Sequence, residues 1–114
     1  MKGTIVRTAE QNEYTHPAHD RFLLRDVVTA ALNPALSVHR GRIEPGGEIR
    51  VHTHEGQTET FYILNGEVVC TMNGVETVLT EGCCVVAPPG IRHGLRNSGE
   101  EPAELLALFT PPIK

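Results

Sequence analysis

Turn-forming residues interrupt this chain at short, regular intervals, and the segments between them are rich in Val, Ile, Leu, Thr and Phe. Each segment is about five to eight residues long, which is typical of a β-strand. Only Val28–Leu32 is compatible with a turn of helix. Many short strands separated by turns predict an all-β sandwich or barrel. The breaks fall at Asn33-Pro34, Pro45-Gly46-Gly47, Asn65-Gly66, Asn73-Gly74, Glu81-Gly82, Pro88-Pro89-Gly90, Asn97-Ser98-Gly99 and Pro111-Pro112.

The hairpin around Asn73-Gly74 can be assigned a register from the sequence. Asn-Gly favours a two-residue type I′ turn, because both residues tolerate positive φ. Counting outward gives one face that is largely apolar and an opposite face of mixed character, as in a half-buried antiparallel pair. The apolar face pairs Met72 with Val75, Cys70 with Thr77 and Val68 with Leu79, and the mixed face pairs Thr71 with Glu76, Val69 with Val78 and Glu67 with Thr80.

The bulk composition narrows the classes of function. The 114 residues, 39% hydrophobic and 21% charged, predict one globular domain over 1–114. A net charge of −4, with arginines interspersed among carboxylates, argues against a nucleic-acid partner. The sequence has no basic amphipathic helix, no long apolar run and no signal-peptide pattern, so we expect a cytoplasmic protein without a membrane partner.

The cysteines, Cys70, Cys83 and Cys84, do not predict a disulfide framework. Alternation along a strand would send the adjacent Cys83 and Cys84 to opposite faces. A metal or redox role for this pair is therefore less favoured than a role as small strand hydrophobes. We expect all three thiols to be free, as in a reducing compartment.

The residues that carry chemistry begin with His52 and His54. They are two apart, so on a strand they project from the same face and can reach one metal ion. Gly56 offers a bend before Glu59, and an antiparallel return would bring that carboxylate beside the two imidazoles. A histidine pair plus a carboxylate suits first-row divalent metals. His93, after the corner at Pro88-Pro89-Gly90, is a fourth candidate ligand, although spacing alone does not bring it near His52.

Two stretches of the chain resemble the signature motifs of the cupin superfamily. The first motif is Gly, five residues, His-x-His, three or four residues, Glu, six residues, Gly, and residues 46–66 match it throughout. The second is Gly, five residues, Pro-x-Gly, two residues, His, three residues, Asn, and residues 82–97 match it throughout. The matching positions are Gly46, His52, His54, Glu59 and Gly66 in the first motif, and Gly82, Pro88, Gly90, His93 and Asn97 in the second.

The resemblance implies a jelly-roll-like antiparallel β-barrel with His52, His54, Glu59 and His93 as inward ligands of one divalent transition-metal ion. Histidine and carboxylate ligands suit Mn, Fe, Ni or Zn, so the sequence leaves the metal open. Glu59 is also the candidate catalytic base. Single-domain cupins of this size are commonly dimers, and small barrels have sheet edges to cover, so we expect a homodimer.

Further residues are predicted to surround the metal. Phe61 and Ile63 share strand parity with Glu59, so they are expected to face inward, in the core and against the substrate pocket. His39 is a candidate pocket residue on the strand before the first motif. His16 and His19 could form a second metal site, but an exposed loop is the favoured interpretation.

The predicted function is that of a metal-dependent enzyme acting on a small oxygenated molecule, most similar to the dioxygenase cupins. A sugar or hydroxy-acid isomerase or lyase is the enzymatic alternative, and a ligand-binding or sensory cupin without turnover is the other. With no Trp and only 4% aromatic residues, the chain is expected to supply a poor stacking surface for a flat aromatic substrate.

Overall fold

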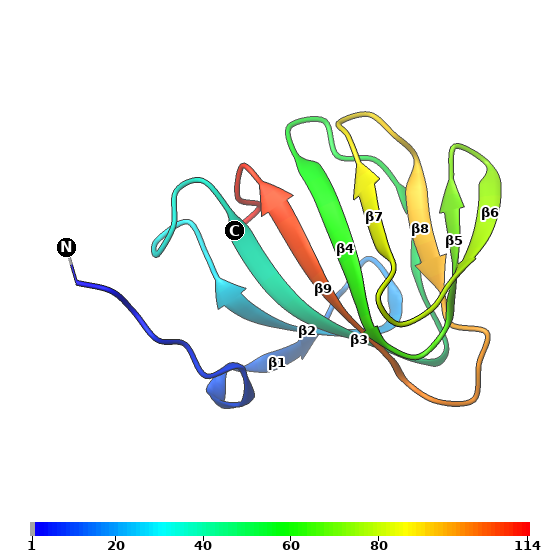
Figure 1. Ribbon diagram of the computed structural model, residues 1–114, viewed down its shortest axis with the longest axis horizontal. Coiled ribbons are helices and arrows are strands. Elements are labelled where there is room, and N and C mark those ends of the chain that lie inside the picture. The colour runs from blue at the N-terminus through cyan, green and yellow to red at the C-terminus, as the bar shows by residue number, and fades with distance from the viewer. Residues whose placement is uncertain (1) are drawn as a thin grey trace.

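The computed structural model describes residues 2–114, which form one highly curled antiparallel sheet (Figure 1). This confirms the prediction of an all-β, antiparallel fold. No helix among these residues is long and apolar enough to cross a membrane. The elements are η1 (Thr8–Glu10), β1 (Glu13–Thr15), β2 (Asp20–Val28), β3 (Ser37–His52), β4 (Thr58–Asn65), β5 (Val68–Met72), β6 (Val75–Leu79), β7 (Cys84–Ala87), β8 (His93–Arg96) and β9 (Ala103–Thr110).

The sheet order is β6-β5-β8-β3-β9-β4-β7, with β2 paired to β3 and β1 to β2. Strand β3 is the hub of this arrangement. Its first half pairs with β9, up to Ile43 opposite Ala103, and its second half pairs with β8, from Glu48 opposite Arg96. The strand therefore changes partner around Pro45–Gly47, which lets one long strand line two sides of the barrel.

The predicted break at Pro45-Gly46-Gly47 is a corner within β3 rather than a turn between two strands. Gly46 adopts φ +78°, which bends the strand without ending it. Asn97, which follows β8, holds this corner through two backbone hydrogen bonds. Its N–H donates to Gly47 O at 3.0 Å, and its carbonyl accepts from Gly46 N at 3.2 Å. Of the segment compatible with a turn of helix, Val28 instead ends β2, and one turn follows it, in which Leu32 N and Asn33 N both donate to Thr29 O at 3.0 Å.

The β5–β6 hairpin has the predicted register, from Met72 opposite Val75 to Val68 opposite Leu79. Inside the barrel, alternate residues of each strand form the core, as the period of two requires. Cys83 packs partly buried against this core, whereas Cys84 is exposed, and all three cysteines are free. The core residues include Phe22, Leu24, Ile43, Ile49, Phe61, Ile63, Val68, Leu95, Ala103, Leu105, Ala107 and Phe109.

Candidate metal centre

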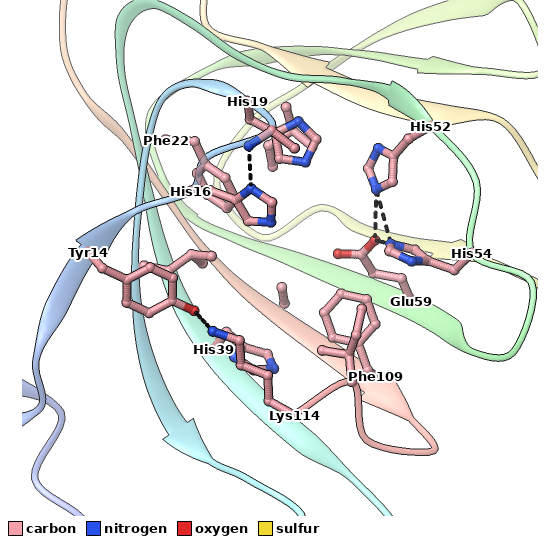
Figure 2. A pocket seen from close by; sticks show the side chains of 15 residues that line it. Tyr14, His16, His19, Phe22, His39, His52, His54, Glu59, Phe109 and Lys114 are labelled. Carbon is pink, nitrogen blue, oxygen red and sulfur yellow. Dashed lines mark hydrogen bonds and ion pairs between the residues drawn. The ribbon is translucent and has the colours of Figure 1, made fainter.

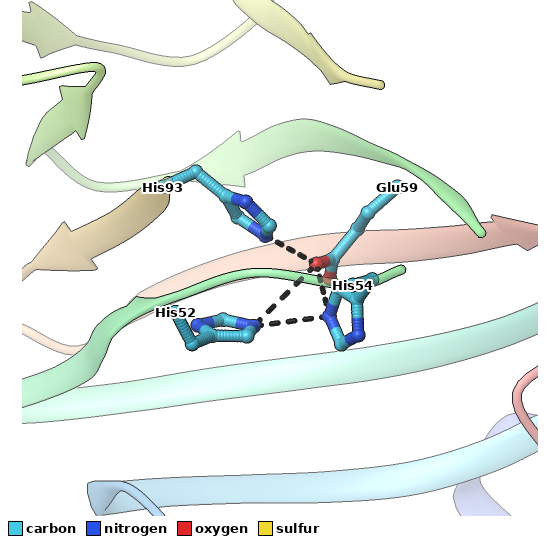
Figure 3. A group of neighbouring side chains, drawn as sticks. All are labelled: His52, His54, Glu59 and His93. Carbon is cyan, nitrogen blue, oxygen red and sulfur yellow. Dashed lines mark hydrogen bonds and ion pairs between the residues drawn. The ribbon is translucent and has the colours of Figure 1, made fainter. Parts of the chain in front are cut away.

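Four side chains from three parts of the barrel meet at one point (Figure 3). His52 is the last residue of β3 and lies directly opposite His93, the first residue of β8. His54 follows just after β3, and Glu59 reaches in from β4. One ligand atom from each of these residues lies within 4.8 Å of the others. The structure thus brings together all four residues that the sequence analysis proposed as ligands.

A β-bulge positions His52. Between Ile49 opposite Leu95 and His52 opposite His93, strand β3 has two residues, Arg50 and Val51, where β8 has only Gly94. A Cβ on Gly94 would lie 2.7 Å from Ile49 O and 2.9 Å from Val51 N, so only glycine fits under the bulge. A bulge bends its strand and leaves one residue outside the ladder. Here the bulge turns the end of β3, which carries His52, toward the cluster. It also leaves the backbone of Arg50 outside the β3–β8 pairing.

For His52 and His93, hydrogen bonds fix which nitrogen of the imidazole faces the centre. The Nδ1 atoms of His52 and His93 each donate to the carbonyl oxygen two residues earlier, Arg50 O at 2.6 Å and Ile91 O at 2.8 Å. A ring nitrogen that donates here leaves Nε2 as the atom available to a metal. The Nε2 atoms of both residues, and that of His54, point into the cluster (Figure 3).

The spacing of the four donor atoms suits one ion. Glu59 Oε1 lies 2.8 Å from His93 Nε2, 3.1 Å from His54 Nε2 and 3.9 Å from His52 Nε2. The Nε2 atoms of His52 and His54 are 3.0 Å apart. Two donors about 2.0–2.1 Å from one ion are about 2.9 Å apart at a right angle and about 4.2 Å apart on opposite sides. The cluster is therefore compatible with a divalent metal ion.

The protonation of the cluster reflects burial and mutual contact. Burial raises the pKa of Glu59, but hydrogen bonds from His54 and His93 outweigh it and leave that pKa below its ordinary value. Burial lowers the pKa of His93, yet its hydrogen bonds to Glu59 and to Ile91 O hold that pKa above its ordinary value. Burial is the largest influence on His52 and lowers its pKa. Glu59 is thus ionised at neutral pH and ready to bind a cation.

A cavity of about 300 Å³ opens beside the cluster, at the lower end of the usual size for small-molecule sites (Figure 2). His52, His54 and Glu59 form its metal-facing wall, and most of the remaining wall is apolar or aromatic. Its residues come from β1, β2, β3, β4 and β9 and from the chain near both ends. They are Tyr14, His16, Ala18, His19, Phe22, Leu24, His39, Ile49, His52, His54, Glu59, Ala107, Phe109, Ile113 and Lys114.

The three proposed pocket residues lie in different places. His39 lines the cavity, although it is only 2% exposed and both its nitrogens are engaged, Nδ1 with Asp26 at 2.8 Å and Nε2 with Ser37 at 3.0 Å. Phe61 and Ile63 face inward but belong to the core and do not line the cavity. The Phe61 ring packs 5.9 Å from the His93 ring, so it supports a ligand instead of touching substrate space.

Tyr14, Asp26 and Lys114 form a hydrogen-bonded group at the end of the cavity that is remote from the metal-facing wall. The Tyr14 hydroxyl donates to Asp26 at 2.6 Å, and Lys114 Nζ donates to the Tyr14 hydroxyl at 2.9 Å. Burial raises the pKa of Asp26, but hydrogen bonds from Tyr14 and His39 leave it below its ordinary value, so Asp26 is ionised. Lys114 Nζ also lies 3.4 Å from Asp26 Oδ2, so the ammonium and the carboxylate are paired at this end of the cavity.

Sequence reasoning missed most of the cavity wall. The low aromatic content did not predict that Tyr14, Phe22 and Phe109, scattered along the chain, would line this one cavity. His16 and His19 do lie in a loop, between β1 and β2, but both are half-buried and line the cavity. Strand alternation could have placed Phe22 and Phe109 inside the barrel. Their convergence depends on β2 and β9 flanking β3, and no local motif encodes that order.

Comparison with known proteins agrees with this fold and site. Residues 39–109 match the family model described as "Cupin domain", and this chain belongs to the cupin family. It is 32% identical to a mannose-1-phosphate guanylyltransferase of Klebsiella pneumoniae over 90% of this chain, and 34% identical to an oxalate-binding protein of Thermotoga maritima over 68% of this chain. The match covers only 22% and 64% of those two relatives, respectively.

A solved structure of a predicted oxalate decarboxylase from Thermotoga maritima superposes with a TM-score of 0.86 at 26% identity. The superposition covers 95% of this chain and 99% of that one. The polyketide cyclase of Streptomyces resistomycificus has the same fold, with a TM-score of 0.84 at 16% identity over 96% of this chain and 80% of that one. The fold is thus shared with a protein named as a cyclase, and it is common to proteins of several functions.

Proposed function

We propose that this protein is a metal-dependent enzyme acting on a small oxygenated molecule with an apolar body, of the dioxygenase type. One observation carries the proposal: the His52, His54 and Glu59 side of the cluster opens directly onto an aromatic, largely apolar cavity. A substrate could place oxygen donors at the metal-facing wall and its body against Phe22, Tyr14 and Phe109. We propose the cytoplasm as its compartment, in keeping with the free Cys83 and Cys84.

The protein's own groups would bind and orient the substrate. Three neutral imidazoles and one carboxylate leave a divalent ion with net positive charge, which favours anionic or enolisable oxygen donors. Such an ion would act as a Lewis acid and, if it is Fe or Mn, would support redox chemistry. Glu59 lines the cavity as a carboxylate, and on leaving the ion it would be the proposed base for a substrate proton. The apolar wall would keep bulk water from the reacting atoms.

Binding of a small dicarboxylate without turnover is the second candidate. The 34% identity to a protein named for oxalate binding favours it. Against it stands the shape of the site, because a small dianion would leave the aromatic part of the cavity unfilled. The two functions differ in the ligand they require: a dicarboxylate binder should prefer oxalate to a carboxylate with a ring.

Metal exchange tests the proposed reaction type. The protein would be reconstituted separately with Fe, Mn and Zn, and oxygen uptake would be followed with small diketones and phenolics. We expect uptake with Fe or Mn and none with Zn, which has no accessible redox couple. Turnover of sugars or uronates by the Zn form without oxygen would contradict the dioxygenase proposal and support an isomerase or lyase. Tight oxalate binding with no turnover in any form would support the binding protein.

A further inference from the structure

His19 lies beside the candidate metal centre but is not part of its donor cluster. It sits just before β2, and its ring lies 5.0 Å from the His52 ring, centroid to centroid. His19 lines the cavity, on the wall next to His52 (Figure 2). A side chain on this wall would lie beside a molecule that is held at the cluster.

The backbone of Arg50 sets His19 and His52 in opposite tautomers. The N–H of Arg50 donates to His19 Nδ1 at 3.0 Å, whereas the carbonyl of Arg50 accepts from His52 Nδ1 at 2.6 Å. An accepting nitrogen carries no hydrogen, so the neutral His19 ring carries its proton on Nε2. His52 has the reverse arrangement, with Nε2 free of hydrogen. Both bonds exist because the bulge at Arg50 and Val51 releases this backbone from the ladder.

The ring of His19 is held in place from several sides. The Arg50 guanidinium binds the carboxylate of Asp20, the next residue after His19, through two bonds of 3.0 and 2.8 Å. The His16 ring lies 4.4 Å and the Phe22 ring 6.0 Å from it. Within residues 2–114, His19 Nε2 makes no hydrogen bond to the protein, and no buried side-chain polar atom there lacks a partner. His19 Nε2 is therefore not buried, and because His19 lines the cavity, this N–H is available to a molecule held there.

We infer that His19 is a specificity residue that donates its Nε2–H to an oxygen atom of the ligand at the metal centre. The inference rests on the proposed function, since it requires a ligand held at that centre. It selects a ligand class: carboxylates, enolates and carbonyl compounds, whose oxygen can both approach the ion and accept a hydrogen bond. Anions that bind metals through nitrogen or sulfur gain less from this donor.

Two substitutions distinguish hydrogen-bond donation by His19 to the ligand from a purely structural role of this residue. In His19→Asn, the amide oxygen can replace Nδ1 as the acceptor for Arg50 N–H, but the donor toward the cavity is lost. In His19→Gln, the longer side chain can place an N–H near the original Nε2, but the bond to Arg50 is lost. The wild type and both variants would be loaded with Co²⁺, and Co²⁺ affinity would be measured first. Acetate and thiocyanate would then be titrated against the visible spectrum.

We expect equal Co²⁺ affinity in the three proteins, because His19 is not a ligand. Acetate should bind the Asn variant about tenfold or more weakly than the wild type, with thiocyanate nearly unchanged, whereas the Gln variant should retain most of the acetate affinity. Equal acetate affinity in all three, or weaker binding by Gln than by Asn, would overturn the inference while leaving the metal site intact. Failure of the wild type to bind Co²⁺ would overturn the proposed function and this inference with it.

Discussion

At the scale of single residues, hydrogen bonds to backbone carbonyls determine which imidazole nitrogen is available to bind a metal. His52 and His93 come from different motifs, yet each directs Nδ1 to the carbonyl two residues earlier and so presents Nε2 to the cluster. His93 also meets an acceptor on its other side, because Nε2 lies 2.8 Å from Glu59 Oε1. Acceptors at both nitrogens favour the imidazolium form of His93, and an ion that binds Nε2 must displace its proton.

Metal affinity should therefore depend on pH near neutrality. The pKa of His93 lies above its ordinary value of 6.5, so protons compete with the metal already at and somewhat above that pH. Affinity for Zn²⁺ should be full well above the pKa of His93 and fall by about tenfold per pH unit below it, with about one proton released per ion bound. Chelator competition from pH 8.5 to 5.5 measures the affinity. A constant affinity between pH 8 and 6 would contradict this role for His93.

The sequence predicted the ligands better than their surroundings. His52, His54 and Glu59 follow from spacing and strand alternation, but His93 was tied to them only by resemblance, because its partner across the ladder is not encoded locally. His16 and His19 were assigned to an exposed loop, since a short His-Pro-Ala-His segment carries no period that indicates a buried wall. The position of His19 depends on Arg50, more than thirty positions further along.

At the scale of elements, turn chemistry and alternation fixed the hairpin but not the long strand. The Asn73-Gly74 turn set the register of β5 and β6 correctly, because a two-residue turn determines every pair beyond it. At Pro45-Gly46-Gly47 the same kind of signal marks a corner inside β3, since the strand finds a new partner on the far side. Local sequence gives the bend, and tertiary pairing decides whether the strand continues.

Gly94 should be intolerant of any side chain. In Gly94→Ala the new Cβ would meet backbone atoms of Ile49 and Val51 at 2.7 and 2.9 Å, and backbone under a bulge cannot move aside cheaply. We expect a loss of about 2 kcal/mol or more in the free energy of unfolding, measured by urea denaturation. Gly56→Ala is the matched control: it lies between the ligands His54 and Glu59, has nothing within 4 Å and should be close to neutral. Equal effects of the two substitutions would contradict the bulge account.

At the scale of the whole molecule, the sheet order assembles a cavity that no segment contains alone. Strand β3 brings β2, β8 and β9 to its two edges, so aromatic residues from the N- and C-terminal strands meet beside the cluster. The cupin fold itself was predictable, because ten motif positions matched and the turns bounded the strands. The contents of the cavity were not, since they depend on which distant strands become neighbours.

The edge strands of the sheet are relevant to whether the protein self-associates. Strands β6 and β7 end the main path and expose Val75, Val78 and Val86, each more than half accessible. Exposed apolar side chains on edge strands favour pairing with another chain, and we expect a homodimer. Light scattering should give about twice the chain mass of 12.5 kDa. A monomer at micromolar concentration would contradict this expectation without affecting the metal site.

Metal content is the most direct test of the account. Elemental analysis of untagged protein, purified without added metal, should find about one divalent transition-metal ion per chain at His52, His54, Glu59 and His93. His52→Ala and His93→Ala should each abolish tight binding, because each removes a donor that the fold has already oriented. A wild-type chain that stays metal-free after reconstitution with Mn, Fe, Ni and Zn would contradict the central claim.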